Sequence, residues 1–292
     1  MESSFHPLSL QEQHRYKDFL ASTPQVASDY SFGNLWAWRE IYGLQWAFDG
    51  ELVWIRQTRP HSVYWAPVGP WHQVHWSDRL GEVAGEKPAF TRIPEDLAAI
   101  WQSVPGLSLE PDPDHWDYIY SVSELTHLKG NKFHKKKNLL RQFQKNYQAQ
   151  YVSLDLSRIE QAFTLQTEWC LWRDCEDSET LEMENQAILA TLRDWQHLED
   201  VFGGGLIVDG NMAAYTIAEP LDQETVVIHF EKACPTFKGI YQAINQIFLE
   251  QEGFAYTFVN REQDLGDPGL RQAKQSYNPV SYLKKYSGSL TG

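Results

Sequence analysis

The sequence predicts an α/β (α+β) protein made of two related halves, each a mixed sheet flanked by helices. One observation is a repeated order of elements. A helix, an Asp-Gly hairpin and a further strand occur twice, and the two Asp-Gly pairs, at Asp49 and Asp209, lie 160 residues apart. The repeat is one of pattern and not of residue identity. A second observation is size, because 292 residues with 42% hydrophobic side chains can bury two compact cores.

Hydrophobic periodicity places the elements of the first half. Apolar spacing predicts helices over residues 8–20 and 32–42. Strands at 44–48 and 52–55 flank Asp49-Gly50, a pair typical of a two-residue turn whose central residues both need positive φ. The remaining elements are a third strand (63–67), a helix after Pro94 (97–101) and a strand that links the two halves (116–121).

The second half is predicted to begin with a basic helix over 132–147. The elements after it are helices at 159–170 and 185–198, strands at 205–210, 212–217 and 225–230, an amphipathic helix at 238–250 and a strand at 256–259. Thr236 is the expected N-cap of the amphipathic helix. The order strand, helix, neighbouring strand implies a right-handed crossover. We therefore expect an N-terminal domain (1–122), a basic linking helix (123–150) and a C-terminal domain (151–292) that carries the site.

Charge is distributed unevenly along the chain. The net charge is −14, yet the segment 125–154 contains seven Lys and Arg residues and no Asp or Glu. A basic island on an acidic protein indicates a local polyanionic partner, and a solvated helix face is the alternative. The residues expected to bind the polyanion are Lys132, His134, Lys136, Lys137 and Arg141. A tRNA acceptor end and an anionic lipid surface are the two partners that fit such a helix.

The three cysteines, Cys170, Cys175 and Cys234, do not have the spacing of a metal site. We expect buried or idle thiols in a reducing cytoplasm, and neither a disulfide nor a metal centre. No apolar run is long enough to span a membrane, and the N-terminus lacks a basic start followed by an apolar segment. These features predict a cytoplasmic protein without a transmembrane segment.

The most informative segment is 258–277. An apolar run ends there in Asn260, Arg261, Glu262 and Asp264. Two glycines around Pro268 follow, and then a short basic stretch. Charges at the end of a buried strand, beside glycines that let the backbone approach a ligand closely, are typical of a site in an α/β sheet. The alternative is an ion-pair network that ties the end of the sheet to the C-terminal tail.

Five segments together resemble a known family. They are Lys129–Asn138, Glu231-Lys232, Lys238–Asn245, Asn260–Gly266 and Gly269–Tyr277. The chain resembles an uncharacterised bacterial group related to the C-terminal domain of phosphatidylglycerol lysyltransferase. That domain is similar to the tandem Gcn5-related N-acyltransferases and to the Fem-type aminoacyltransferases. The resemblance implies tandem acyl-CoA N-acyltransferase-like domains and transfer of an aminoacyl or acyl group.

The chemistry of such a transfer indicates roles for individual residues. Such transfer needs fixed donors for an oxyanion and a nucleophile that loses its proton. The candidate catalytic residues are Glu231, Arg261, Glu262 and Asp264. The residues expected to bind the substrate or donor are Lys238, Gly239, Tyr241, Asn245, Asn260, Gly266, Arg271, Lys274 and Tyr277. His229 is either a base or a hydrogen-bonded core residue.

One departure from the family pattern bears on the donor. Acyl-CoA users carry Gln/Arg-x-x-Gly-x-Gly/Ala at the corresponding helix start, whereas Thr236–Tyr241 has one glycine. This favours an aminoacyl-tRNA donor over acyl-CoA, with no tightly bound cofactor. The expected function is transfer of an activated acyl group from tRNA or CoA to an amine or hydroxyl. The alternatives are a non-catalytic module that binds RNA, a nucleotide or a lipid headgroup, and a scaffold whose Trp-rich first half forms a homodimer.

Overall fold

The computed structural model describes residues 4–82 and 88–290, and the chain divides into two compact units. The first unit is Met1–Asp117, Gln263–Pro268 and Tyr282–Gly292, and the second is Tyr118–Glu262 and Gly269–Ser281. These limits differ from the expected domain boundaries at the C-terminus. The last strand, β14 (Lys285–Leu290), belongs to the first unit because it pairs with β5 (Ala89–Pro94) and β6 (Leu107–Pro111). Residues 123–150, expected as a separate linking helix, lie within the second unit.

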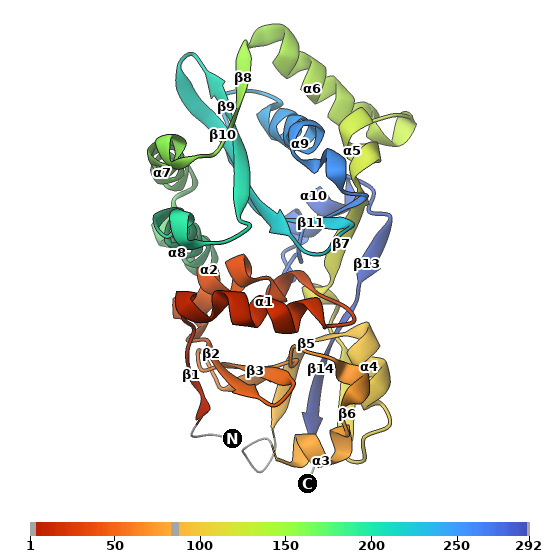
Figure 1. Cartoon of the computed structure of the whole chain (residues 1–292). Coiled ribbons are helices and arrows are strands. Elements are labelled where there is room, and N and C mark those ends of the chain that lie inside the picture. The colour runs from red at the N-terminus through yellow and green to blue at the C-terminus, as the bar shows by residue number, and fades with distance from the viewer. Residues whose placement is uncertain (1–3, 83–87, 291–292) are drawn as a thin grey trace. The chain divides into compact units, whose positions relative to one another are not determined.

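The first unit is built on a seven-stranded mixed sheet (Figure 1). The strand order is β1 (His6–Pro7), β2 (Gln45–Asp49), β3 (Leu52–Gln57), β4 (Val63–Trp65), β5, β14 and β6. Neighbouring strands are antiparallel except for β4 and β5, which are parallel. The strands β5, β6 and β14 were not predicted, because the partners of β14 lie far away in the sequence.

Helices and aromatic side chains complete this unit. Its helices are α1 (Gln13–Ala21), α2 (Phe32–Tyr42), α3 (Trp76–Gly81) and α4 (Glu95–Trp101), with short 3-10 turns at Leu10–Glu12, Ser28–Tyr30, Trp71–Gln73 and Pro113–His115. The predicted helix at 32–42 is confirmed. Ser31 caps it through its side chain, and Gly43 ends it with φ +57°. Trp46, Trp54 and Trp65 are buried in the core of the unit.

The two Asp-Gly hairpins turn differently. In the second hairpin, Asp209 and Gly210 are the two central residues and both have positive φ, as predicted. In the first hairpin, Asp49 pairs with Leu52, so the central residues are Gly50 and Glu51, and only Gly50 has positive φ. The prediction for the first turn was therefore wrong by one residue, because a glycine at the first central position is also compatible with a two-residue hairpin.

The second unit is built on another seven-stranded mixed sheet. The strand order is β13 (Ser281–Leu283), β7 (Asp117–Ser121), β12 (Phe258–Asn260), β11 (Thr225–Ala233), β10 (Asn211–Pro220), β9 (Phe202–Val208) and β8 (Ala149–Ser153). Strands β11 and β12 are parallel neighbours joined through helix α9 (Ile240–Gln251), which agrees with the predicted crossover. Their ends bring Glu231 and Arg261 to one region of the sheet.

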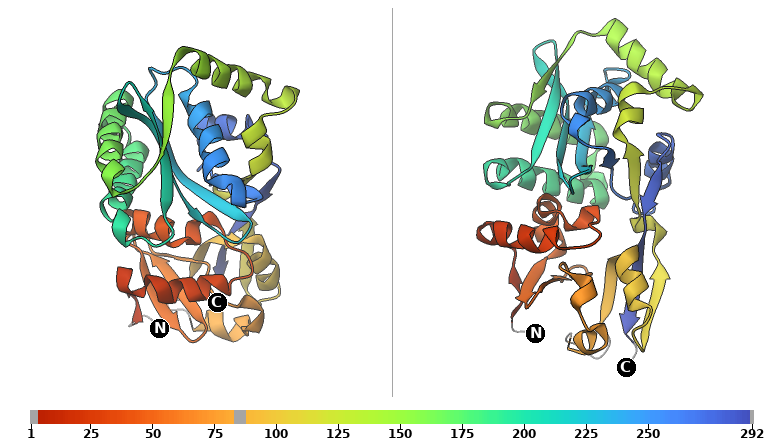
Figure 2. Two further views of the ribbon diagram at one scale, coloured as in Figure 1. Left: turned by 45° about the horizontal axis from the view of Figure 1, so that its top comes forward. Right: turned by 45° about the vertical axis from the view of Figure 1, so that its right-hand side comes forward.

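Helices cover both faces of this second sheet. Helix α7 (Leu156–Arg173) packs on β10 and β11, and α9 packs on β9, β10 and β11. Figure 2 shows α7 and α8 (Glu179–Arg193) on one face and α9 on the other. The remaining helices are α5 (Val122–His127), α6 (His134–Asn146) and α10 (Pro268–Gln275), with short turns at Asn131–Phe133, Cys175–Asp177, Trp195–His197 and Gly253–Ala255. None of the described helices is long and apolar enough to cross a membrane.

Two local expectations in this unit were wrong. Cys170 and Cys175 form a disulfide, with their Cα atoms 5.0 Å apart. The sequence predicts free thiols instead, but α7 ends before Cys175 because Asp174 adopts φ +49°, which turns the chain back. Thr236 does not cap α9. The N-cap position is Gly239, and no side chain caps it.

Candidate functional site

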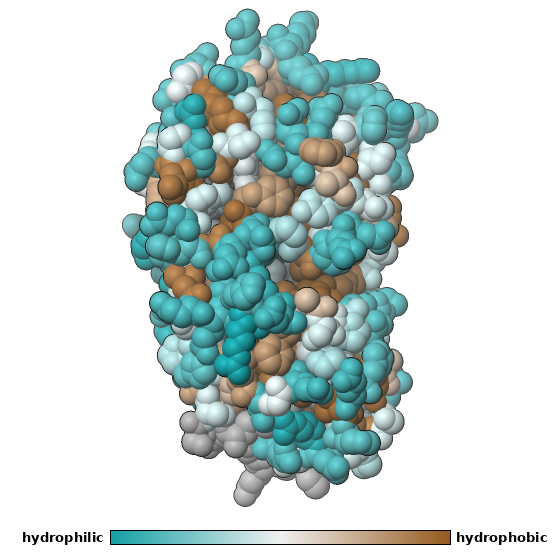
Figure 3. Space-filling view, viewed as in Figure 1, coloured by the Kyte–Doolittle hydropathy of each residue, from teal (hydrophilic) through white to brown (hydrophobic). Residues whose placement is uncertain are grey.

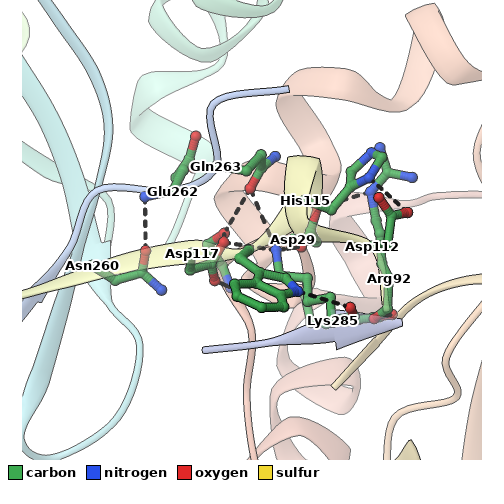
Figure 4. Close-up of polar contacts among 12 residues, drawn as sticks. Asp29, Arg92, Asp112, His115, Asp117, Asn260, Glu262, Gln263 and Lys285 are labelled. Carbon is green, nitrogen blue, oxygen red and sulfur yellow. Dashed lines mark hydrogen bonds and ion pairs between the residues drawn. The ribbon is translucent and has the colours of Figure 1, made fainter. Parts of the chain in front are cut away.

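Strand β12 ends in a sharp turn that sets the direction of Arg261. The side-chain oxygen of Asn260 accepts a hydrogen bond from the backbone N–H of Glu262 at 2.8 Å (Figure 4). Glu262 has φ +56°, which is uncommon outside glycine. Asn260 is fully buried, so its expected role as a substrate contact is replaced here by a hydrogen bond within the turn.

Arg261 is paired with a carboxylate of the neighbouring strand. Its Nη2 lies 3.0 Å from Oε1 of Glu231, and Nδ2 of Asn245 donates to Oε2 of Glu231 at 3.2 Å. The side chains of Arg261 and Glu231 are 16% and 8% exposed. Burial opposes the charge of Arg261, but the Glu231 carboxylate outweighs it and raises the pKa of the guanidinium. Three sequence-predicted residues therefore form one cluster.

Tyr277 brings a second cation to this cluster. The guanidinium carbon of Arg261 lies 4.9 Å from the centre of the Tyr277 ring, and Nζ of Lys136 lies 3.8 Å from the same centre. Burial lowers the pKa of Lys136 to about 8, and the charge of Arg261 adds to this effect. No described carboxylate lies within ion-pair distance of Lys136. We call Glu231, Arg261, Tyr277, Lys136 and Asn245 the open cluster.

Lys136 also lines a cavity of about 630 Å³ between α6 and α10. The other lining residues are Asn131, Lys132, His134, Lys135, Leu139, Gly269, Gln272, Ala273 and Ser276. The charged residues among them are three lysines, and none is acidic. On the face drawn in Figure 3, the surface around α6 is mostly hydrophilic. We call this space the basic cavity.

The predicted polyanion-binding residues meet only partly at this cavity. Lys132, His134 and Lys136 line it, whereas Lys137 and Arg141 do not. Lys132 also forms an ion pair with Glu124 at 2.7 Å, so part of its charge is balanced. Lys135, Gln272 and Ser276 line the cavity although sequence reasoning did not select them. Their positions depend on how α10 lies against α6, which no local pattern signals.

His229 lies between two glutamates. Its Nε2 donates to Glu219 at 2.8 Å and its Nδ1 donates to Glu262 at 2.7 Å. Burial opposes the imidazolium, but these two hydrogen bonds raise the pKa of His229 to about 10. A histidine that stays protonated cannot act as a base, which supports the alternative of a hydrogen-bonded core residue. Glu262, a predicted catalytic residue, accepts one of these two hydrogen bonds.

Other predicted residues of the second unit have packing or backbone roles. Lys274 donates to the backbone oxygens of Arg261 and Glu262, so it holds the turn after β12. Tyr241 accepts a hydrogen bond from Nε1 of Trp169 at 3.0 Å. Gly239 has φ +89°, and a Cβ there would lie 2.2 Å from the backbone oxygen of Leu139. Gly239 is thus required where α9 packs against α6. Two other predicted residues lie at the surface: Lys238 is exposed and Arg271 is partly exposed.

Two predicted residues belong to the first unit. Asp264 is buried, and its carboxylate accepts the backbone N–H of Gly266 at 2.9 Å. Gly266 has φ +78°, and a Cβ there would lie 3.0 Å from a carboxylate oxygen of Asp114. Both residues therefore shape a turn of the first unit, and neither contributes to the open cluster as described.

The first unit contains an ionic cluster that sequence reasoning missed (Figure 4). Nζ of Lys285 contacts the carboxylates of Asp29 and Asp117, the latter at 2.7 Å. Nε of Arg92 donates to Asp29 at 2.8 Å, and Ser28 donates to Asp117 through both its backbone N–H and its hydroxyl. The four charged side chains are at most 7% exposed. We call Asp29, Arg92, Asp117 and Lys285 the closed cluster.

The pKa shifts of the closed cluster agree with its charge balance. Burial opposes ionisation of Asp29, but Lys285 and Arg92 together lower the pKa of Asp29. Burial also opposes the charge of Lys285, but Asp117 and Asp29 raise its pKa. In the described residues of either unit, no group of three or more His, Cys, Asp or Glu side chains is arranged to hold a metal ion.

Comparison with known proteins places this chain in a family. The model of the family "Phosphatidylglycerol lysyltransferase, C-terminal" matches residues 20–287. No curated protein matches the chain significantly. A conserved protein of unknown function from Bacteroides thetaiotaomicron is 29% identical, with a TM-score of 0.89 over 98% of this chain and 99% of that one.

Two more distant structures share the fold. L-PGS from Bacillus licheniformis is 12% identical, with a TM-score of 0.63 over 96% of this chain and 92% of that one. FemX is 9% identical, with a TM-score of 0.62 over 97% of this chain and 96% of that one. The predicted tandem N-acyltransferase fold of the Fem-like type is confirmed.

Proposed function

The chain belongs to the phosphatidylglycerol lysyltransferase C-terminal family, and we propose that it transfers an aminoacyl group from a tRNA-type ester to a hydroxyl acceptor. Family and fold support a transferase of this general type. The donor and the acceptor are our proposal. The family name points to the headgroup of an anionic lipid such as phosphatidylglycerol as the acceptor.

One observation carries the proposal. Two cations, Lys136 and Arg261, face one aromatic ring, and the carboxylate of Glu231 is paired with Arg261 only. The excess positive charge lies beside the basic cavity. Removing charge from water is costly unless an opposite charge balances it. A phosphate-bearing substrate or an oxyanion in the open cluster would supply that balance.

The transfer reaction places simple demands on these residues. The acceptor hydroxyl attacks the carbonyl carbon of the aminoacyl ester, the ester C–O bond breaks, and the released sugar hydroxyl takes up a proton. Arg261 is a fixed donor for the oxyanion that forms in between, and Glu231 holds its guanidinium in place. With a pKa of about 8, Lys136 has a neutral fraction near pH 7 that can accept the hydroxyl proton and return it to the leaving oxygen.

The geometry at α9 favours an aminoacyl-tRNA donor over acyl-CoA. A glycine at a helix start can let a pyrophosphate approach the backbone closely. In this chain the space beside Gly239 is filled by the backbone oxygen of Leu139 in α6. The basic cavity instead offers lysines along one side of α6, which suits the phosphodiester backbone of an RNA end.

A non-catalytic polyanion-binding module is the second candidate. It is favoured by the basic cavity alone, because lysines bind phosphates without any chemistry at Arg261. The two candidates differ in one respect: the transferase forms a covalent bond between the aminoacyl group and the acceptor, whereas the binding module does not.

The test is a transfer assay with purified protein. Radiolabelled aminoacyl-tRNA mixtures or acyl-CoAs are incubated with vesicles that contain phosphatidylglycerol, and label in the lipid fraction is counted. Vesicles of neutral lipid only test whether the acceptor is anionic. We expect label from aminoacyl-tRNA and not from acyl-CoA, and loss of label in Arg261→Met. Arg193→Met, a change at an exposed residue at the end of α8, is the matched control and should leave transfer unchanged. Salt-sensitive RNA binding without label transfer would support the binding module and contradict the transferase.

A further inference from the structure

A second cavity lies in the same unit, beside α7. Its volume is about 500 Å³, within the size range of small-molecule pockets. One side of it is formed by Gln161, Thr164, Leu165, Glu168 and Trp172 of α7. The other side is formed by residues 208–213, around the turn of the β9–β10 hairpin, and by Cys234 and Phe237. None of these residues belongs to the open cluster or to the basic cavity.

The charges of this cavity are opposite to those of the basic cavity. Its charged lining residues are Glu168 and Asp209, and none is Lys or Arg. Both residues are exposed, and neither carboxylate has a described cation within ion-pair distance. Two uncompensated carboxylates at one pocket favour a cationic ligand.

The walls of the cavity are apolar and aromatic. Leu165, Met212 and Phe237 supply hydrophobic surface. Trp172 is 41% exposed, and among the described residues no aromatic ring or cation packs on its indole. A tryptophan face beside carboxylates is an arrangement that attracts organic cations, because the ring face is negative. The ligand should therefore join an apolar body to its charged group.

We propose that the cavity between α7 and the β9–β10 turn binds an organic amine in its ammonium form, with an alkyl or aryl body. The ammonium group lies near Glu168 and Asp209. The apolar body lies against Trp172 and the hydrophobic wall. The site is separate from the transfer reaction, so it does not depend on the proposed function.

The experiment is isothermal titration calorimetry of the full chain with four probes. Hexylamine and phenethylamine test the proposal. Hexanol and hexanoate have similar apolar bodies and lack the positive charge. We expect the two amines to bind, and hexanol and hexanoate to bind at least about fivefold more weakly, which is the scale of one partly exposed charge contact. Equal binding of hexanol and hexylamine, or no binding of either amine, would overturn the proposal.

Variants of α7 locate the site. Glu168→Gln should weaken hexylamine about fivefold, and Trp172→Ala should weaken phenethylamine more than hexylamine because it removes the aromatic face. Glu160→Gln removes a carboxylate from the same helix outside the cavity and should change nothing. Arg261→Met should also leave amine binding unchanged, even if it abolishes transfer. If Glu160→Gln weakens binding as much as Glu168→Gln, the effect is one of overall charge and the site is refuted.

Discussion

The two ionic clusters, one in each unit, are built from similar side chains in different surroundings. The closed cluster pairs two cations, Arg92 and Lys285, with two carboxylates, and all four side chains are nearly inaccessible. In the open cluster, Arg261 is paired with the single carboxylate, Glu231, whereas Lys136 faces the ring of Tyr277 and lines the basic cavity.

The difference between the two clusters shows how charge balance decides whether charged residues stabilise the fold or remain available to a ligand. A balanced, buried cluster has no charge left for a ligand, so its residues hold the fold together. An unbalanced cluster beside a cavity is incomplete until an anion is bound, so its residues are available for chemistry. Substitutions should therefore affect stability in the first unit and activity in the second.

The largest expected effect is in the closed cluster. Lys285→Met removes the ammonium that the buried carboxylates of Asp29 and Asp117 both contact. Breaking a buried ion pair in this way costs about 3–5 kcal/mol. Urea unfolding should show that loss of free energy of unfolding. Lys284→Met, at the neighbouring and more exposed lysine, is the control. A loss of under about 1 kcal/mol in Lys285→Met would contradict the description of this cluster as structural.

An intermediate effect is expected at His229. His229→Gln removes the cation between Glu219 and Glu262 and should cost about 2 kcal/mol at pH 7, the scale of a hydrogen bond to a charged group. The pKa of His229 is raised from 6.5 to about 10, so its contribution to stability is complete below about pH 6.5 and is lost as pH rises through about 10. The stability difference between wild type and variant, measured by urea unfolding, should narrow between pH 8 and pH 10. A difference that does not change with pH would show that His229 is not charged.

A smaller effect is expected at Glu231. Glu231→Gln retains the shape of the side chain and removes the charge that holds Arg261. Transfer should fall about tenfold, the equivalent of one weakened charge-assisted hydrogen bond. Glu224→Gln, at an exposed position just before β11, is the control. Unchanged transfer in Glu231→Gln would remove Glu231 from the site.

The smallest effect concerns the pH dependence of binding. The pKa of Lys136 is lowered to about 8, so its ammonium loses its charge as pH rises through about 8. The affinity for a short RNA duplex, whose phosphodiesters do not titrate there, should weaken about fivefold between pH 7 and pH 9. Fluorescence anisotropy measures this, and Lys136→Gln should flatten the profile. The same pH dependence in wild type and variant would assign it to another group.

Local patterns in the sequence were sufficient for much of the second unit. The positive φ of Asp209 and Gly210, and the order β11, α9, β12, depend on neighbouring residues and were predicted correctly. Glu231, Arg261 and Asn245 were also selected from the sequence, because they lie in the segments that resemble the family and have the chemistry that acyl transfer needs.

Contacts between segments far apart in the sequence could not be predicted from local patterns. Lys285 pairs with Asp29 and Asp117 across more than half of the chain, and no local signal marks a strand that returns to the first sheet. Lys136 was selected for its charge, but its contact with Tyr277 follows only from tertiary packing. The disulfide was missed because it depends on the φ of a single residue, Asp174.

The most direct test of the difference between the clusters is a matched pair of arginine variants. Arg261→Met and Arg92→Met each remove one guanidinium that is paired with one carboxylate. Thermal unfolding and aminoacyl transfer per folded molecule are measured for both. We predict that Arg92→Met lowers the Tm by about 5 °C or more and keeps its transfer rate. Arg261→Met should lose about 100-fold in transfer with a smaller change in Tm. Equal loss of transfer in both variants, or full transfer in Arg261→Met, would contradict the assignment of the open cluster as the site.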